Sequence, residues 1–365
     1  MEETTATGGT AFDRRRFLGL TAATGAGLVL GSGLVLTAGA PALAAPVPTI
    51  HPTSEWGATP AAGAIQMLPQ PPTKLFIHHT DSPNSTDYSL QHAYALARSI
   101  QNDHIKNRGW VDSGQQFTLT RGAHALEGRH RSLEALRRGD EHVQGAHCYA
   151  QNDFAVGIEN EGNYMTAAPR AEHYAALVEL SAYICAQFGI RAYQIYGHRN
   201  FNATDCPGDQ LYAMLPRLRA DVATRIGGDP TPAAWTTLRA GASGERVRAL
   251  QYQLRAHGAT VIADGSFGPG TESAVRTFQS SVHASVDGEA GPQTWNQLHR
   301  QLARGSSGEA VKAVQNQLNA AGIPVGTVDG AFGPATESGV RTFQTRAKFP
   351  VDGVVDPRTL ARLTA

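Results

Sequence analysis

A repeated segment near the carboxyl end constrains this chain of 365 residues more than any other feature. The motif D-G-x-F-G-P at 264–269 recurs at 329–334, and V-R-T-F-Q at 275–279 recurs at 340–344, both at an offset of 65 residues. Upstream of these motifs the offset is 64, so the second copy carries one inserted residue. A fixed period of this length indicates two consecutive copies of one small structural unit.

Each copy predicts three short helices. The first helix has apolar residues at Val247, Leu250 and Leu254, which is the i, i+3, i+7 spacing of one helical face, and the second copy repeats the stripe. The D-G-x-F-G-P motif interrupts the chain as a turn. Threonines are placed to cap the second helix and prolines to open the third: Thr271, Thr336, Pro292 and Pro357.

The first 45 residues have the pattern of an export signal. Arginines at 14–16 precede an apolar, Gly/Ala-rich stretch, and A-L-A follows at 42–44. This order is typical of a secretory signal peptide, and the arginine pair followed by Phe17-Leu18 resembles a twin-arginine signal. A membrane anchor is the alternative, although several glycines interrupt the stretch. We expect removal near Ala45 and a mature protein that is secreted or held at the cell wall.

Charge and cysteine content exclude several classes of protein. Lys+Arg 31 balance Asp+Glu 31, which leaves no general attraction for nucleic acid or anionic lipid. Three cysteines are too few for a disulfide scaffold. Whether Cys148 and Cys185 pair stays open at this point.

Two histidines and a cysteine form a candidate metal site. The segment 74–80 reads as a strand that ends in His78 and His79, and another short apolar segment precedes His198. Cys206 follows His198 by eight residues. Two imidazoles and a thiolate make a three-ligand zinc set that leaves a fourth position for water, whereas structural zinc normally has four protein ligands. The set therefore predicts catalytic Zn²⁺.

These motifs, in this order, resemble the zinc amidase family that includes the peptidoglycan recognition proteins and the phage lysozyme-type amidases. The resemblance spans roughly 74–212 and implies a mixed central sheet flanked by helices. The implied reaction is hydrolysis of the amide between N-acetylmuramic acid and L-alanine in peptidoglycan. The matching motifs are H-H-T at 78–80, G-W-x-D-x-G-x-x-F at 109–117, G-A-H at 145–147, G-I-E-x-E-G at 157–162, G-H-R at 197–199 and T-x-C-P-G at 204–208.

The resemblance also suggests residue roles. It implies His78, His198 and Cys206 as the zinc ligands, with His79 in a packing or supporting role. Thr204 matches a position beside the zinc, where a hydroxyl can bond the oxyanion. His147 either lines the substrate groove or is a core histidine.

One departure from the family pattern concerns proton transfer. Many recognition-type amidases have Tyr where this chain has Gln115, and a Gln cannot donate a proton in the same way. Glu159 is the alternative, because anhydro-muropeptide amidases of this fold carry Glu in the matching stretch and a carboxylate near zinc can act as general base. Strand alternation predicts Glu161 on the same face, in support. A surface carboxylate is the competing interpretation for Glu159, and Gln115 becomes a candidate substrate contact.

The repeat resembles the peptidoglycan-binding module found beside many cell-wall hydrolases. The fold class we expect is therefore multidomain, with an α/β amidase domain followed by two small all-α three-helix modules. The expected segments are a signal peptide at 1–45, the amidase domain at 46–226, a Gly/Pro-rich linker at 227–234, and modules at 235–300 and 301–365.

The sequence is compatible with three functions. The first is an exported zinc amidase that two modules anchor to peptidoglycan, with no nucleic-acid partner and no stable membrane insertion after signal removal. The second is a non-catalytic recognition protein on the same fold, which would typically lack a ligand such as the cysteine. The third is a zinc peptidase of the stem peptide, whose ligand patterns the sequence does not contain.

Overall fold

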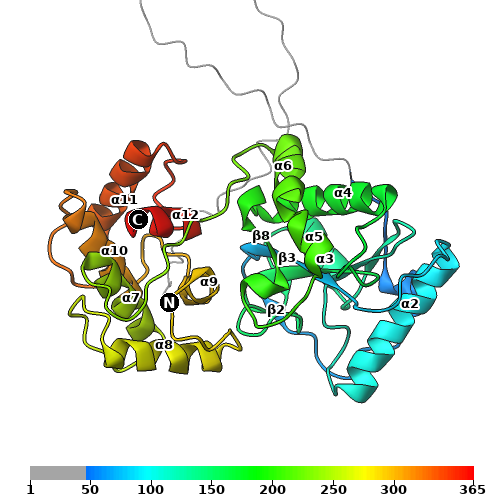
Figure 1. The fold of residues 1–365 in the computed structure, drawn as a ribbon. Coiled ribbons are helices and arrows are strands. Elements are labelled where there is room, and N and C mark those ends of the chain that lie inside the picture. The colour runs from blue at the N-terminus through cyan, green and yellow to red at the C-terminus, as the bar shows by residue number, and fades with distance from the viewer. Residues whose placement is uncertain (1–46) are drawn as a thin grey trace, which may run out of the picture. The chain divides into compact units, whose positions relative to one another are not determined.

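The structure, a computed structural model, describes residues 47–365 (Figure 1). The predicted export signal lies outside the described residues. Between residues 47 and 365 the structure contains no helix with both the length and the apolar composition needed to cross a membrane.

A six-stranded mixed sheet forms the centre of the amino-terminal half. Its strand order is β1-β5-β4-β7-β3-β8, and all neighbouring strands run parallel except β4 and β5. A separate antiparallel pair joins β2 (Met67–Leu68) to β6 (His142–Val143). The strands of the large sheet are β1 (Ile50–His51), β3 (Lys74–His79), β4 (Phe117–Leu119), β5 (Ala125–Glu127), β7 (Ala155–Asn160) and β8 (Ile195–Gly197).

Alternation along the central strands separates a core face from a site face. Leu75 and Ile77 of β3 join the main apolar core together with Ile158 of β7. Successive side chains of a strand point to opposite faces, so Phe76 and His78 point to the other face. Phe76 packs there in a smaller cluster with Cys148, Ala155, Tyr196 and Phe201.

Helices cover the core face and extend beyond the sheet. Helices α4 (Ala171–Phe188) and α6 (Leu215–Ile226) pack against each other and bury their apolar residues in the main core. Helix α2 (Leu90–Asn102) buries Ala93 and Ala97 against Trp56 and continues as a π-helical turn. The remaining elements are α1 (Thr53–Trp56), the π turn η2 (Asp103–Asn107), α3 (Ser132–Arg138), the 3₁₀ turns η3 (Ala192–Gln194) and η4 (His198–Asn200), and α5 (Asp209–Ala213).

The carboxyl-terminal third contains two three-helix modules, which confirms the prediction from the repeat. Each module has its own apolar core, one around Val247, Leu250 and Trp295 and the other around Val311 and Val340. Helices α7 and α10, which are equivalent in the two modules, pack against each other. The helices are α7 (Glu245–Ala256), α8 (Pro269–Ser281), α9 (Pro292–Leu298), α10 (Glu309–Ala320), α11 (Pro334–Ala347) and α12 (Pro357–Leu363).

Buried glutamines explain why the D-G turns recur. Gln279 is 1% exposed and donates to Asp287, the Glu289 carbonyl and Thr294 at 2.7 to 2.9 Å. Its carbonyl oxygen accepts the N–H of Gly288, whose positive φ of 76° favours glycine. The other three D-G turns are held in the same way by Gln251, Gln315 and Gln344.

One expected detail of the modules is wrong. Thr271 and Thr336 do not cap the second helix, because α8 begins at Pro269 and α11 at Pro334. A proline fits the first helical position, where its missing N–H removes no hydrogen bond. Thr271 lies in the first turn instead and its hydroxyl bonds the carbonyl of Ser266. Pro292 and Pro357 open the third helices, as predicted.

Candidate metal centre

The first candidate ligand comes from the central strand β3. His78 is 3% exposed and points to the site face, opposite the apolar residues that precede and follow Phe76. His79 takes part in a different contact: its Nδ1 accepts the N–H of Tyr164 at 3.3 Å. Alternation along one strand therefore separates the two adjacent histidines.

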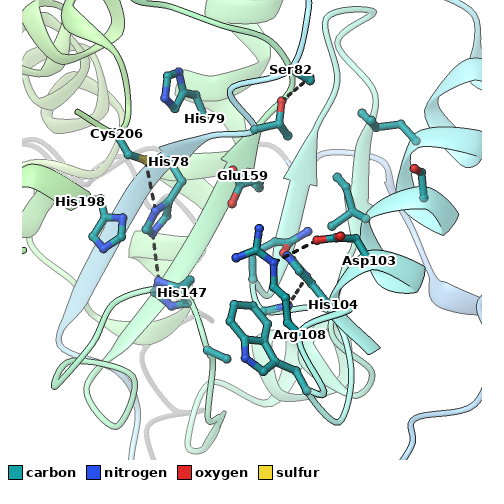
Figure 2. A pocket seen from close by; sticks show the side chains of 18 of the residues that line it. His78, His79, Ser82, Asp103, His104, Arg108, His147, Glu159, His198 and Cys206 are labelled. Carbon is teal, nitrogen blue, oxygen red and sulfur yellow. Dashed lines mark hydrogen bonds and ion pairs between the residues drawn. The ribbon is translucent and has the colours of Figure 1, made fainter. Parts of the chain in front are cut away.

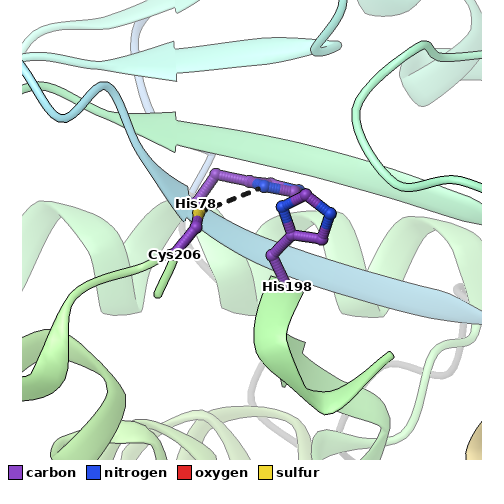
Figure 3. A group of neighbouring side chains, drawn as sticks. All are labelled: His78, His198 and Cys206. Carbon is purple, nitrogen blue, oxygen red and sulfur yellow. Dashed lines mark hydrogen bonds between the residues drawn. The ribbon is translucent and has the colours of Figure 1, made fainter. Parts of the chain in front are cut away.

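The other two candidates lie just beyond β8, the strand next to β3. His198 begins the 3₁₀ turn η4 immediately after β8 ends at Gly197. Cys206 follows in the loop, where the Arg199 N–H donates to its carbonyl at 3.0 Å. The ligand atoms of His78, His198 and Cys206 all lie within 4.8 Å of one another, and Cys206 Sγ is 3.6 Å from His78 Nδ1 (Figure 3).

In His78 and in His198, Nε2 bonds a neighbouring side chain, so Nδ1 is the nitrogen that remains for a metal. His198 Nε2 lies 2.9 Å from the side-chain oxygen of Asn202, which only accepts, so this nitrogen carries the hydrogen and Nδ1 keeps its lone pair. His78 Nε2 lies 3.0 Å from His147 Nδ1, which leaves His78 Nδ1 beside the cysteine sulfur (Figure 2). Two neutral imidazoles and one thiolate are a donor set that fits Zn²⁺. This is the same trio that the sequence singled out.

Burial sets the protonation of these groups in the absence of metal. It lowers the pKa of His78 well below its ordinary value, and neighbouring histidines lower it further. Burial also lowers the pKa of His198 and raises the pKa of the Cys206 thiol well above its ordinary value. Metal binding must therefore displace a proton from sulfur, while both imidazoles are already neutral.

Glu159 lies directly beside His78 on the neighbouring strand. The register of β3 with β7 pairs the two residues, and adjacent strands lie about 4.8 Å apart. The Glu159 side chain is half-buried and its carboxylate forms no hydrogen bond with any described residue. Burial raises its pKa to about 8, although Arg108 opposes this shift. A carboxyl group in this state can exchange a proton near neutral pH.

Glu161, predicted as support for Glu159, does not line the cavity. Strand β7 ends at Asn160, so the alternation that would place both glutamates on one face stops there. One Glu161 oxygen lies 2.6 Å from His92 Nε2 and the other accepts the Arg121 N–H at 2.7 Å. Its role is to connect α2 with the sheet.

A cavity of about 660 Å³ contains the metal-site residues and Glu159 (Figure 2). Its far wall comes from the π-helical turn and the segment after it, where Arg108 pairs with Asp103 at 3.0 Å and lies over Trp110. Sequence reasoning did not assign this wall to the site. The cavity is lined by His78, His79, Thr80, Ser82, Leu96, Ser99, Ile100, Asp103, His104, Arg108, Trp110, Gly114, Gln115, Ala146, His147, Glu159, His198, Thr204 and Cys206.

The remaining predicted site residues also reach this cavity. The Thr204 hydroxyl oxygen accepts the N–H of Cys206 at 3.2 Å, which leaves its hydrogen available. The Gln115 amide donates to Thr118 at 2.9 Å, and its side-chain oxygen is buried with no partner among the described residues. His147 packs closely against a glycine: a Cβ on Gly157 would lie 2.9 Å from its ring.

The cysteines that the sequence left unresolved are separate. Cys148, Cys185 and Cys206 are all free thiols. Cys185 lies in the main core and Cys148 in the cluster around Phe76, on the opposite face of the sheet. Cys148 donates to the side-chain oxygen of Asn202 at 3.3 Å. Asn202 itself was missed in the sequence, although its position four residues after His198 suits a ligand-supporting acceptor.

Comparison with known proteins identifies the families that the two parts of the chain match. The N-acetylmuramoyl-L-alanine amidase family matches residues 68–209, and the peptidoglycan binding domain family matches residues 243–298 and 307–363. Peptidoglycan recognition protein 1 of Bos indicus is 32% identical over 163 residues, which are 44% of this chain and 79% of that protein. The chain belongs to the amidase and peptidoglycan recognition protein family.

Other members of this family differ in length from the chain. The N-acetylmuramoyl-L-alanine amidase of Sus scrofa is 34% identical over 185 residues, which are 49% of this chain but 29% of that protein. The chain thus spans about a third of the length of the longer curated amidases that it matches. Among solved structures, wild-type Drosophila PGRP-LB is 29% identical and covers 46% of this chain and 92% of its own, with a TM-score of 0.41.

Proposed function

We propose that the chain is an exported zinc hydrolase that cleaves the amide between N-acetylmuramic acid and L-alanine in peptidoglycan, and that the two modules hold it on the wall. The observation that carries this proposal is the position of Glu159 beside the His78, His198 and Cys206 trio in one cavity. Family membership supports the same substrate.

The chemistry divides between a metal and the protein. His78, His198 and Cys206 would hold Zn²⁺, which when bound supplies a Lewis acid that polarises a carbonyl and acidifies water. Glu159 accepts a proton from the attacking water and returns it to the amide nitrogen as the carbon–nitrogen bond breaks. Its raised pKa suits this exchange, since the same carboxyl must release and regain a proton near neutral pH.

The cavity walls supply the groups that orient the substrate. The Thr204 oxygen accepts the Cys206 N–H, and this bond leaves the hydroxyl hydrogen unused. Thr204 can therefore donate that hydrogen to the developing oxyanion. The free side-chain oxygen of Gln115 can accept an N–H of the stem peptide, which would satisfy a buried acceptor. His147 fixes the orientation of His78 through their shared hydrogen bond.

The competing function is peptidoglycan recognition without cleavage. Recognition proteins are among the relatives of this chain, so the fold alone does not distinguish the two. The complete ligand trio and an unpaired Glu159 favour catalysis, because a receptor has no need for a half-buried carboxyl group with a raised pKa.

The deciding experiment treats purified sacculi with zinc-loaded protein and counts new chain ends. An amidase releases L-alanine amino termini and no new reducing sugar ends. A stem peptidase would expose other amino termini, and a recognition protein would bind without releasing any. Cys206→Ser should bind the wall but cleave nothing, whereas Cys185→Ala, in the main core, is the matched cysteine control. Cleavage by Cys206→Ser at the wild-type rate would refute the ligand assignment.

A further inference from the structure

The segment between two candidate ligands is held by the first module. Residues 199–203 follow His198 and lead toward Cys206, and module 1 satisfies a backbone group of each of them. Ala203 N–H donates to the His283 carbonyl at 2.8 Å. The side-chain amides of α9 supply the rest: Gln293 bonds the Arg199 carbonyl at 3.0 Å and the Asn202 carbonyl at 2.9 Å, Asn296 bonds the Asn200 carbonyl at 3.3 Å, and Gln297 bonds the Phe201 carbonyl at 3.0 Å.

Asn202 carries these contacts to the candidate metal ligand. It is 5% exposed, and its side-chain oxygen accepts from His198 Nε2 at 2.9 Å. Its side-chain nitrogen donates to the Val282 carbonyl of module 1 at 2.8 Å. One carboxamide therefore connects the His198 imidazole with module 1. Because its oxygen and nitrogen belong to one rigid planar group, the bond to Val282 fixes the direction of the bond to His198.

The second module shows that these amides are not needed for the module fold. At the offset of 65 residues, Gln293, Asn296 and Gln297 correspond to Arg358, Ala361 and Arg362. The folding residues of the same helix are retained, since Thr294 and Leu298 correspond to Thr359 and Leu363. The three carboxamides are thus specific to module 1, where they bond the metal loop and also Ser285, Trp235 and Val282 of the module itself.

Burial makes this contact energetically significant. Gln297 is fully buried and also donates within module 1, and its side-chain oxygen accepts from Gln151 of the amidase domain at 2.6 Å. The ring of Tyr149 in the amidase domain also stacks on the ring of His283 in module 1, with the ring centroids 3.8 Å apart. A buried amide that loses its partner costs about 1–3 kcal/mol, so these bonds favour one fixed arrangement of the loop.

We propose that module 1 is part of the catalytic unit, where it orients His198 through the positioning residue Asn202, rather than a freely moving wall anchor. This inference rests on the proposed zinc site. Docking of the module and metal binding are then coupled: loss of the α9 amides weakens the metal site, and metal binding stabilises the docked module.

The test measures zinc and cobalt binding on the full chain. Removing a ligand-supporting group typically costs 10–100-fold in metal affinity, so Asn202→Ala should weaken zinc binding by about that factor in competition with a chromophoric chelator. Gln293→Ala and Gln297→Leu should weaken it in the same direction, although neither contacts a ligand, and should change the visible spectrum of bound Co²⁺. Arg362→Ala, the exposed module 2 equivalent of Gln297, is the control and should leave both unchanged.

A second measurement needs no variant. Zinc should slow amide hydrogen exchange in 282–283 and in α9 (Pro292–Leu298) more than in the equivalent α12 (Pro357–Leu363). This comparison remains valid if Gln297→Leu proves unstable.

The possible failures are distinguishable. Unchanged zinc affinity and cobalt spectra in both α9 variants, with no zinc effect on exchange in α9, would overturn the coupling while leaving the metal site in place. A wild-type chain that binds no zinc would instead overturn the proposed function on which the coupling rests.

Discussion

Replacing Glu159 with Gln tests the proposed base and the cost of burying it in one variant. The side chain is half-buried, makes no hydrogen bond with any described residue and lies beside His78, its register partner on the neighbouring strand. Gln has nearly the same shape but cannot take a proton. Turnover should therefore fall by about 10²–10⁴-fold while zinc binding and wall binding are retained.

The same variant should stabilise the metal-free protein in a pH-dependent way. Burial raises the pKa of Glu159 from 4.5 to about 8, so the folded state holds a proton that the unfolded chain releases. Stability from this group is complete below about pH 4.5 and is lost as the pH rises toward 8. Glu159→Gln avoids that loss, which amounts to at most roughly 3 kcal/mol at pH 7.

Urea unfolding in the presence of a chelator provides the assay. The stability difference between Glu159→Gln and wild type should be small near pH 5 and should grow by pH 7.5. Glu161→Gln is the control: it disturbs the bonds to His92 and Arg121, so it should lower stability without removing the base. A turnover loss below about threefold, or a stability difference independent of pH, would refute the reasoning about Glu159.

Three further predictions concern the ligands and the modules. The Cys206 pKa is raised and both histidines are neutral, so zinc binding releases one proton, from the thiol. The apparent zinc dissociation constant should therefore fall about tenfold per pH unit between roughly pH 6.5 and 8.5. A dissociation constant that does not vary with pH would contradict thiol deprotonation. Gln279→Ala removes four hydrogen bonds around a D-G turn and should cost about 2–4 kcal/mol in urea unfolding, whereas Arg362→Ala should cost little. Deleting 302–365 should weaken cosedimentation with insoluble peptidoglycan, by up to about 10²–10⁴-fold if both modules bind together. The deletion should slow cleavage of a small soluble muropeptide far less. Equal losses in the two assays would argue against anchoring.

Much of this protein follows from local sequence signals. The three helices of each module were predictable because apolar spacing, D-G turns and helix-opening prolines act within a few residues. The strand that carries His78 was predictable for the same reason. The choice of His78, His198 and Cys206 needed the order of motifs as well, since no local rule connects residues so far apart in the chain.

The tertiary structure decided which polar groups meet. Glu159 lies beside His78 and Glu161 does not line the cavity, because β7 ends at Asn160 and strand register, not spacing alone, determines the neighbours. Cys148 and Cys185 do not pair because they lie on opposite faces of the sheet.

The contact between Asn202 and module 1 also had no signal in the sequence. Asn202 and Val282 are 80 residues apart, and carboxamides such as Gln293 occur at no period that would mark them. Their bonds are short-range and directional, so they form only once the packing of two distinct apolar cores brings the groups within about 3 Å. The sequence therefore determined the elements and the ligand candidates, while packing between distant segments determined the surroundings that orient them.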